Sequence, residues 1–130
     1  MSATADVTDL IPDPVPRALG REFMQAAERD NERTLKRFVD AGFPINYQDP
    51  LTGESALHAC AGTRAHTVLR YLVGTGKVDY LLRDKGGRLA SELAYLFGDD
   101  PAAARLLGSK ERKQAETQGI TLTRRPNISP

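Results

Sequence analysis

The residues of this chain that could carry chemistry gather between positions 58 and 66. His58 and Cys60 are two positions apart, a spacing that points their side chains to different faces of a helix. His66 could share a metal ion with His58, but no third or fourth ligand stands at a suitable spacing. A histidine acts in catalysis only beside a positioned partner. The sequence therefore predicts neither a nucleophile nor a metal site here.

Two further motifs are suggestive by residue type, but both have structural explanations. Gly86-Gly87 lacks the Gly-Lys-Ser/Thr of a phosphate-binding loop and is typical of a turn. Asp99-Asp100 stands immediately before Pro101, where a carboxylate caps a helix N-terminus. No catalytic constellation remains, so we expect a non-enzymatic protein without a cofactor or metal.

The elements that position these residues recur every 34 residues. The small pair Ala26-Ala27 returns as Cys60-Ala61 and then as Ala94-Tyr95. The larger apolar residues return at the same offset, as Leu35, Phe38 and Val39, then Leu69, Leu72 and Val73, then Ala103, Leu106 and Leu107. A fixed period of about 20–50 residues indicates stacked repeats that bury their apolar faces against one another. The recurring side chains are therefore predicted to form the core.

Each unit has the pattern of helix, turn, helix and extended loop. In the first unit Asp30-Asn31 can cap the second helix, and Gly42 supplies a left-handed stop. Ser55 is placed to cap the first helix of the second unit. The later boundaries are predicted at Gly74 and Gly76, at Asp99 or Asp100, and at Gly108.

The extended loop, which occurs as PINYQDPLTGES and as VDYLLRDKGGR, distinguishes this chain from tetratricopeptide repeats of the same period. With that loop the chain resembles the ankyrin repeat family, whose units read D-x-x-G-x-T-P-L-H-x-A-A and then V-V-x-L-L-x-x-G-A-D-V-N. The match spans about residues 18–108 and is sharpest at Asp49, Gly53, Ser55, Ala56, Leu57, His58, Cys60, Ala61, Val68, Leu69, Leu72, Val73 and Gly76. It implies an all-α repeat fold, an ankyrin-type helix-turn-helix solenoid with β-hairpin-like loops.

The resemblance implies structural roles for His58 and Cys60. The His58 imidazole would bond the hydroxyl or backbone near Ser55 and the neighbouring loop, while Cys60 would fill a small buried position. Departures from the family pattern fall at the loops. Thr52 reads as one extra residue in the hairpin, and a second extra residue lies within Val78–Arg83.

The third unit departs furthest. Leu89-Ala90 replaces the Thr-Pro pair, so the hydroxyl cap is lost, and the family's inter-helix glycine is present only here, as Gly98. We predict an N-terminal flexible arm over 1–16 and an ankyrin domain over 17–108, with units at about 17–49, 50–83 and 84–108. A C-terminal capping helix, Lys110–Gln118, and a basic tail would follow over 109–130.

Composition is that of a soluble globular domain, with 40% hydrophobic and 27% charged residues in 130. No apolar run approaches the about 18 residues of a membrane span. The N-terminal MSATADVTDLIPDPVP lacks the basic start and apolar stretch of a secretory signal. Cys60 is the only cysteine, which fits a reducing compartment, so we expect a cytoplasmic protein.

A net charge of +1 gives no general attraction to nucleic acid or anionic lipid. Charge is uneven, however: the arm is acidic, and the C-terminal segment is basic through Lys110, Arg112, Lys113, Arg124 and Arg125. Both are read as solvated termini. Nucleic-acid association through the basic tail is an alternative, although the aromatic residues that stack on single strands are missing there.

The predicted partner surface is the concave face that loop tips and first helices form in such stacks. The resemblance places contact positions there, and aromatic and arginine residues, which dominate binding energy, add to them. The predicted contact residues are Tyr47, Gln48, Leu51, Glu54, Thr63, Tyr80, Arg83, Lys85, Arg88, Leu96 and Phe97. Leu96 and Phe97 are apolar where the family faces solvent; alternatively, they pack under the C-terminal segment.

The predicted function is a protein-binding module, an adaptor or inhibitor that acts by occlusion or tethering through a rigid surface. Its partner would be another protein, and the chain itself a monomer or a weak homodimer. A homodimeric structural protein, with Leu96-Phe97 as the dimer patch, is the other alternative.

Overall fold

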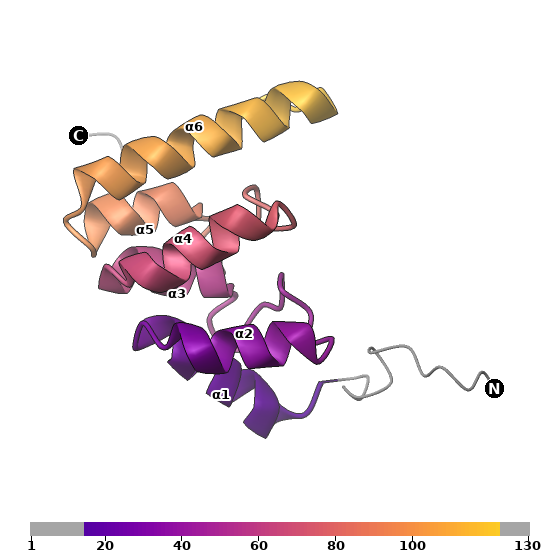
Figure 1. Ribbon diagram of the computed structural model, residues 1–130. Coiled ribbons are helices and arrows are strands. Elements are labelled where there is room, and N and C mark those ends of the chain that lie inside the picture. Colours follow the sequence, from indigo (N-terminus) through magenta and orange to yellow (C-terminus); the bar gives the residue numbers. More distant parts are fainter. Residues whose placement is uncertain (1–14, 123–130) are drawn as a thin grey trace.

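The structure, a computed structural model, describes residues 15–122. The predicted arm as far as residue 14, and Arg124 and Arg125 of the tail, lie outside the described residues. Helices in the described part pack as pairs, and Figure 1 shows the three pairs stacked in chain order. The helices are α1 (Arg17–Glu28), α2 (Glu32–Asp40), α3 (Ala56–Thr63), α4 (His66–Thr75), α5 (Ala90–Leu96) and α6 (Pro101–Gln118). The predicted all-α solenoid is confirmed.

The first helices of the three pairs form one layer, because α3 packs between α1 and α5. The second helices lie beside them, with α2 against α4 and α6 along α5. Alanine dominates the faces where first helices meet, since small side chains let the helix axes approach closely. Ala27, Ala56 and Ala61 are all buried. The recurring small residues of the sequence are therefore what sets the spacing of the stack.

An aromatic cluster fills the core of the first unit. Phe23 lies at the centre, with its ring centroid 4.4 Å from that of Phe43 and 6.0 Å from that of Phe38. Tyr47 closes the cluster edge-on to Phe43, at 5.3 Å between centroids. Aromatic pairs at such separations add to the stabilisation that burial alone provides.

Each pair of helices is joined by a residue in the left-handed conformation. These residues are Asp30 (φ 57°), Arg64 (φ 61°) and Asp99 (φ 47°). The first two are 34 positions apart, but the second and third are 35 apart. The third unit thus contains one extra residue between its helices, and its left-handed residue is Asp99 rather than the predicted inter-helix Gly98.

The extra residue shifts the register of α6 and corrects one prediction. Leu106 was aligned with buried Leu72 at the 34-residue offset, but Leu106 is 42% exposed. Leu107, one position later, is fully buried, and Ala103 corresponds to Val68 in the same way. The predicted equivalence of Ala103, Leu106 and Leu107 with Leu69, Leu72 and Val73 is therefore wrong by one residue.

Tyr95 corrects the prediction for the small pair. Its counterparts Ala27 and Ala61 are buried against the next first helix, whereas Tyr95 is 65% exposed. In the described part of the chain no further first helix packs on α5, so this position has room for a large side chain.

Of the predicted helix ends, Gly76 is confirmed as the left-handed C-cap of α4 (φ 68°), but Gly74 lies inside that helix. The end predicted at Gly108 is wrong, because Gly108 lies inside α6, whose C-cap is Gly119 (φ 69°). The segment predicted as a separate capping helix is the second half of α6. A glycine in a helix interior costs only about 0.5–1 kcal/mol, which the buried contacts of the second half offset.

Buried Glu111 makes one of those contacts. Its carboxylate accepts hydrogen bonds from the Ser91 backbone N–H (3.1 Å) and from the Ser91 hydroxyl (2.7 Å), at the first turn of α5. Leu89 supplies no hydroxyl cap, as predicted, and Glu111 together with Glu92, which accepts from the Leu89 N–H at 2.7 Å, replaces it. Burial raises the pKa of Glu111, and the Ser91 bonds oppose that rise.

A similar contact between units starts α4. Ala65, at the N-cap position, has no side chain that can accept a hydrogen bond. Instead, the carboxylate of Asp30, in the turn between α1 and α2, accepts a hydrogen bond from the Val68 N–H at 2.8 Å. Asn31 and Asp100 cap their own helices by accepting from Thr34 N–H and Ala103 N–H, as predicted.

Substitutions at two glycines test this account of the third unit. A Cβ atom at Gly98 would lie 2.6 Å from the Ala61 carbonyl oxygen, so Gly98→Ala is expected to lower the free energy of unfolding by about 1–3 kcal/mol. At Gly108 the nearest atom is a flexible Arg112 nitrogen at 3.4 Å, so Gly108→Ala is expected to raise it by about 0.5–1 kcal/mol. Urea unfolding followed by circular dichroism measures both; destabilisation by Gly108→Ala would argue against a continuous α6.

Candidate protein-binding surface

Two hairpin loops project beside the first helices. The first, Asp49–Glu54, closes with a hydrogen bond from Asp49 N–H to the Glu54 carbonyl (2.8 Å). The second, Asp84–Arg88, closes in the same way from Asp84 N–H to the Arg88 carbonyl (3.0 Å). The loops touch directly, because Lys85 N–H donates to the carbonyl of Thr52 at 2.9 Å. The predicted extra residue Thr52 thus joins one loop to the next.

His58 links the second unit to the third, as the resemblance implied. Its Nδ1 accepts a hydrogen bond from the Ser55 N–H (3.2 Å) and lies 2.9 Å from the Ser55 hydroxyl oxygen, while Nε2 lies 2.8 Å from the Arg88 carbonyl oxygen. Since that carbonyl can only accept, we assign the ring proton to Nε2. Burial lowers the pKa of His58, so the ring is neutral at pH 7.

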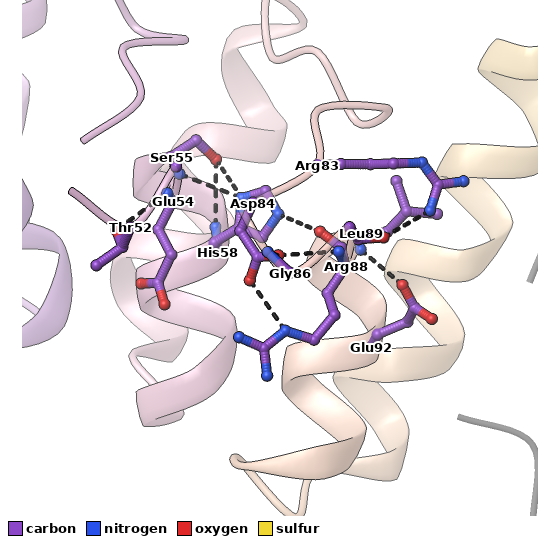
Figure 2. A network of polar contacts seen from close by, with 12 residues as sticks. Thr52, Glu54, Ser55, His58, Arg83, Asp84, Gly86, Arg88, Leu89 and Glu92 are labelled. Atoms are coloured by element: carbon purple, nitrogen blue, oxygen red, sulfur yellow. Dashed lines mark hydrogen bonds and ion pairs between the residues drawn. The ribbon is translucent and has the colours of Figure 1, made fainter. Parts of the chain in front are cut away.

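A second polar centre holds Arg88 in place (Figure 2). The buried Asp84 carboxylate accepts from the backbone N–H groups of Gly86 and Arg88, both at 2.9 Å, and from Arg88 Nε at 3.0 Å. The central guanidinium carbon of Arg88 lies 5.1 Å from the ring centroid of Phe97, a cation–π contact. The Arg88 side chain is therefore fixed between a carboxylate and an aromatic ring.

Phe97 is exposed for 63% of its surface and Leu96 for 44%. Among the described residues, then, the C-terminal segment does not cover either side chain. Phe97 follows the last turn of α5, and Arg64, at the corresponding turn after α3, donates to the carbonyls of Gly98 (3.3 Å) and Asp99 (3.2 Å) beside it. Sequence reasoning missed Arg64, whose role depends on the left-handed turn.

Carboxylates gather around Glu54 at the first loop. Burial raises the pKa of Glu54, and the negative charges of Asp84, Glu28 and Asp49 raise it further against the opposing effect of Arg88. Glu54 and Arg88 project from the same side of the loops in Figure 2. We call Arg88 and Phe97 the Arg88–Phe97 pair, and Glu28, Asp49 and Glu54 the Glu54 cluster.

The remaining predicted contact residues divide into two groups. Leu51 (71% exposed), Thr63 and Lys85 are open to solvent. The others are engaged in holding the loops together. Gln48 donates to the carbonyls of Gly53 (2.9 Å) and Arg83 (3.0 Å), Arg83 donates to the Gly87 carbonyl (2.8 Å), the Tyr80 N–H donates to Gln114 (2.8 Å), and Tyr47 belongs to the aromatic cluster.

The two residues with possible chemistry outside this surface also have structural partners. Cys60 is buried, as the resemblance implied, and burial raises the pKa of its thiol. The His66 side chain is half-exposed, and its Nε2 lies 2.6 Å from a carboxylate oxygen of Asp100. This bond lowers the pKa of Asp100. Over residues 15–122 no three histidine, cysteine or acidic side chains lie close enough to share a metal ion.

The pKa of Glu54 leads to a prediction with a defined sign. Because the pKa is raised in the folded state, the native chain binds more protons than the unfolded one between the two values, and stability falls as the pH rises through that window. Glu54→Gln is therefore expected to melt above the wild type at pH 7. The difference should disappear as the pH falls towards the ordinary glutamate value of about 4.3.

Glu116→Gln, on the exposed side of α6, is the control for a lost surface charge. A lower melting temperature for Glu54→Gln at pH 7 would contradict this reading.

The fold and the loops together define a helical repeat protein with a preformed surface made by its hairpin loops and first helices. A family model for ankyrin repeats, in three copies, matches residues 23–117. The chain belongs to the ankyrin repeat family, whose repeats are generally protein–protein interaction modules. A search of curated proteins found no match to the chain. None of the helices between residues 15 and 122 combines the length and the apolar character needed to cross a bilayer.

Proposed function

We propose that this chain is a non-enzymatic binding module that grips another protein through the surface of its hairpin loops and first helices. An adaptor or inhibitor in the cytoplasm is the role that such a module would have. The observation that carries the proposal is the Arg88–Phe97 pair. Phe97 is 63% exposed, yet the guanidinium lies over its ring and is anchored on a buried carboxylate.

Three features support a binding role for this surface. Aromatic and arginine side chains dominate the energetics of protein interfaces. An arginine that is already fixed loses little conformational entropy when a partner binds. Leu51, 71% exposed at the tip of the first loop, adds a second apolar contact. An exposed apolar side chain on a rigid loop is what a partner can cover without rearranging the stack.

Affinity capture with three immobilised proteins tests the proposal. The wild type is compared with Phe97→Asp and with Ile120→Asp, which also changes an exposed apolar residue but lies just beyond α6. We expect proteins retained by the wild type and by Ile120→Asp to be lost with Phe97→Asp, at similar melting temperatures. Equal recovery by all three would contradict the proposal.

Leu51→Ala is the milder companion variant and is expected to weaken binding without moving the melting temperature. Arg88→Ala does not have this property, because it removes a counter-ion from buried Asp84 and so affects folding as well.

Self-association is a second candidate, and exposed apolar side chains at the third unit favour it. Tyr95 is 65% exposed and adjoins Leu96 and Phe97 in the sequence, and Leu106, 42% exposed, lies on α6, which packs along α5. Light scattering at several protein concentrations tests this candidate: a rising mean mass that Leu106→Asp abolishes supports a dimer, and a constant monomer mass contradicts it.

A further inference from the structure

The binding surface carries opposite charges on neighbouring units. Glu54 immediately precedes Ser55, the N-cap of α3, and Arg88 immediately precedes Leu89, the N-cap of α5. The two residues therefore hold equivalent positions in consecutive units, and both side chains project from the same side of the loops (Figure 2).

The side of the second unit is negative. Asp49 lies beside Glu54, because the Asp49 N–H donates to the Glu54 carbonyl at 2.8 Å. Burial raises the pKa of Glu54, and repulsion from Asp84, which Arg88 holds, and from Glu28 and Asp49 raises it further. Of the described groups around Glu54 that influence it, Arg88 is the one with positive charge. A cation from a partner would relieve this repulsion.

The side of the third unit offers donors beside an apolar surface. Arg88 donates to Asp84 through Nε, and that bond does not use its two terminal nitrogens. Arg64 adds a guanidinium next to Gly98 and Asp99, and Lys85 is exposed on the loop. A carboxylate whose neighbouring side chain is apolar could bind Arg88 and cover Phe97 at once.

The separation of the two equivalent backbone positions follows from helix packing. Neighbouring packed helices lie about 8–10 Å apart, and α3 and α5 are such neighbours. This distance corresponds to about three residues of an extended segment at ~3.3 Å per residue, or to about six or seven residues of a helix at ~1.5 Å.

We propose, building on the function above, that the partner presents a bipolar segment: an acidic residue beside an apolar one at the Arg88–Phe97 pair, and a basic residue about 8–10 Å away at the Glu54 cluster. The charges fix both the register and the direction of the segment, because the reversed arrangement places like charges together.

A phage-displayed library of random peptides, selected on the whole chain, tests the proposal without a known partner. We expect enriched peptides to contain an acidic residue next to an aromatic or large aliphatic one, with a basic residue at about three or about six to seven positions from it. Replacing that acidic residue by its amide in a synthetic peptide is expected to weaken binding at least about tenfold, the effect of losing a charge-assisted hydrogen bond.

A charge reversal on the protein gives the sharper test. Glu54→Lys is expected to weaken a selected peptide about tenfold or more and to bind better than the wild type a peptide whose basic residue is changed to Glu. Lys36→Glu, at an exposed ion pair on α2, is the matched charge reversal and should change neither affinity. Melting temperatures of both variants confirm that they are folded.

Three results separate this inference from the proposed function. Peptides that are lost with Phe97→Asp but show no charge pattern would overturn the bipolar segment and leave the binding surface standing. Equal effects of Glu54→Lys and Lys36→Glu would overturn it too. Peptides and captured proteins that ignore Phe97→Asp would overturn both.

Discussion

Replacing His58 with alanine is expected to lower the free energy of unfolding by about 3–5 kcal/mol. The ring is buried and lies between two units, with Nδ1 bonded at Ser55 and Nε2 at the Arg88 carbonyl. Its removal leaves a cavity and deprives two groups of their partners, and a buried group without a partner costs about 1–3 kcal/mol. The total free energy of unfolding of a domain of this size is about 6–20 kcal/mol. A substantial part of it therefore depends on this one side chain.

Ser55→Ala is the matched control for His58→Ala. It removes the N-cap hydroxyl that accepts from the His58 N–H (3.3 Å), and a lost N-cap costs about 1 kcal/mol. The difference between the two variants therefore measures the link between units rather than the cap. Urea unfolding followed by circular dichroism provides both values. A His58→Ala variant as stable as Ser55→Ala would show that the bond to Arg88 contributes nothing.

The contribution of His58 also depends on pH in a defined direction. The unfolded chain takes up a proton near the ordinary histidine pKa of about 6.5, whereas burial keeps the folded ring neutral to lower pH. The contribution is thus complete above that value and is lost as the pH falls towards the folded pKa. The stability difference between wild type and His58→Ala should accordingly shrink between pH 7 and pH 5 and should not grow.

The second large effect is expected at Leu107. Leu107→Ala removes a fully buried side chain from α6 and should cost about 2–5 kcal/mol, as should the equivalent Leu72→Ala in α4. Leu106→Ala changes a side chain that is 42% exposed and should cost less than about 1 kcal/mol. The strict 34-residue offset predicts the reverse order for Leu106 and Leu107. A larger loss at Leu106 would therefore contradict the extra residue in the third unit.

Sequence alone predicted the fold because the strongest signals are local or recur. The small residues of the first helices and the cap at Ser55 lie where the period places them, and the family resemblance anticipated the partners of His58. The register of α6 could not be predicted in this way. Gly98 and Asp99 both accept a turn conformation, and only the packing of Gly98 against the Ala61 carbonyl selects Asp99 as the left-handed residue.

Hydrogen bonds between elements far apart in the sequence were also beyond reach of sequence analysis. Asp30, in the turn between α1 and α2, completes the start of α4, and Glu111 of α6 completes the start of α5. The glycine at position 108 led to the prediction that the helix ends there. In the structure the helix continues through it, since Glu111 and Ala115 in its second half are buried against the stack.

The candidate surface, too, could be predicted from the sequence only in part. Leu51 and Phe97 are apolar at positions that the repeat does not need, and both are exposed. Tyr47 and Gln48 have residue types typical of interfaces, but one packs on an aromatic cluster and the other bonds two loops. A partly buried aromatic residue and an exposed one look the same in a sequence, so only the surrounding packing separates them.

A hydrogen-exchange footprint of the chain with its captured partner tests the central claim most directly. We expect the partner to slow exchange in the loops Asp49–Glu54 and Asp84–Arg88 and at the ends of α3 and α5, and to leave α2 and α4 unchanged. Slowed exchange on α2 and α4, with both loops unaffected, would contradict the claim that the surface of the Arg88–Phe97 pair is where this protein binds.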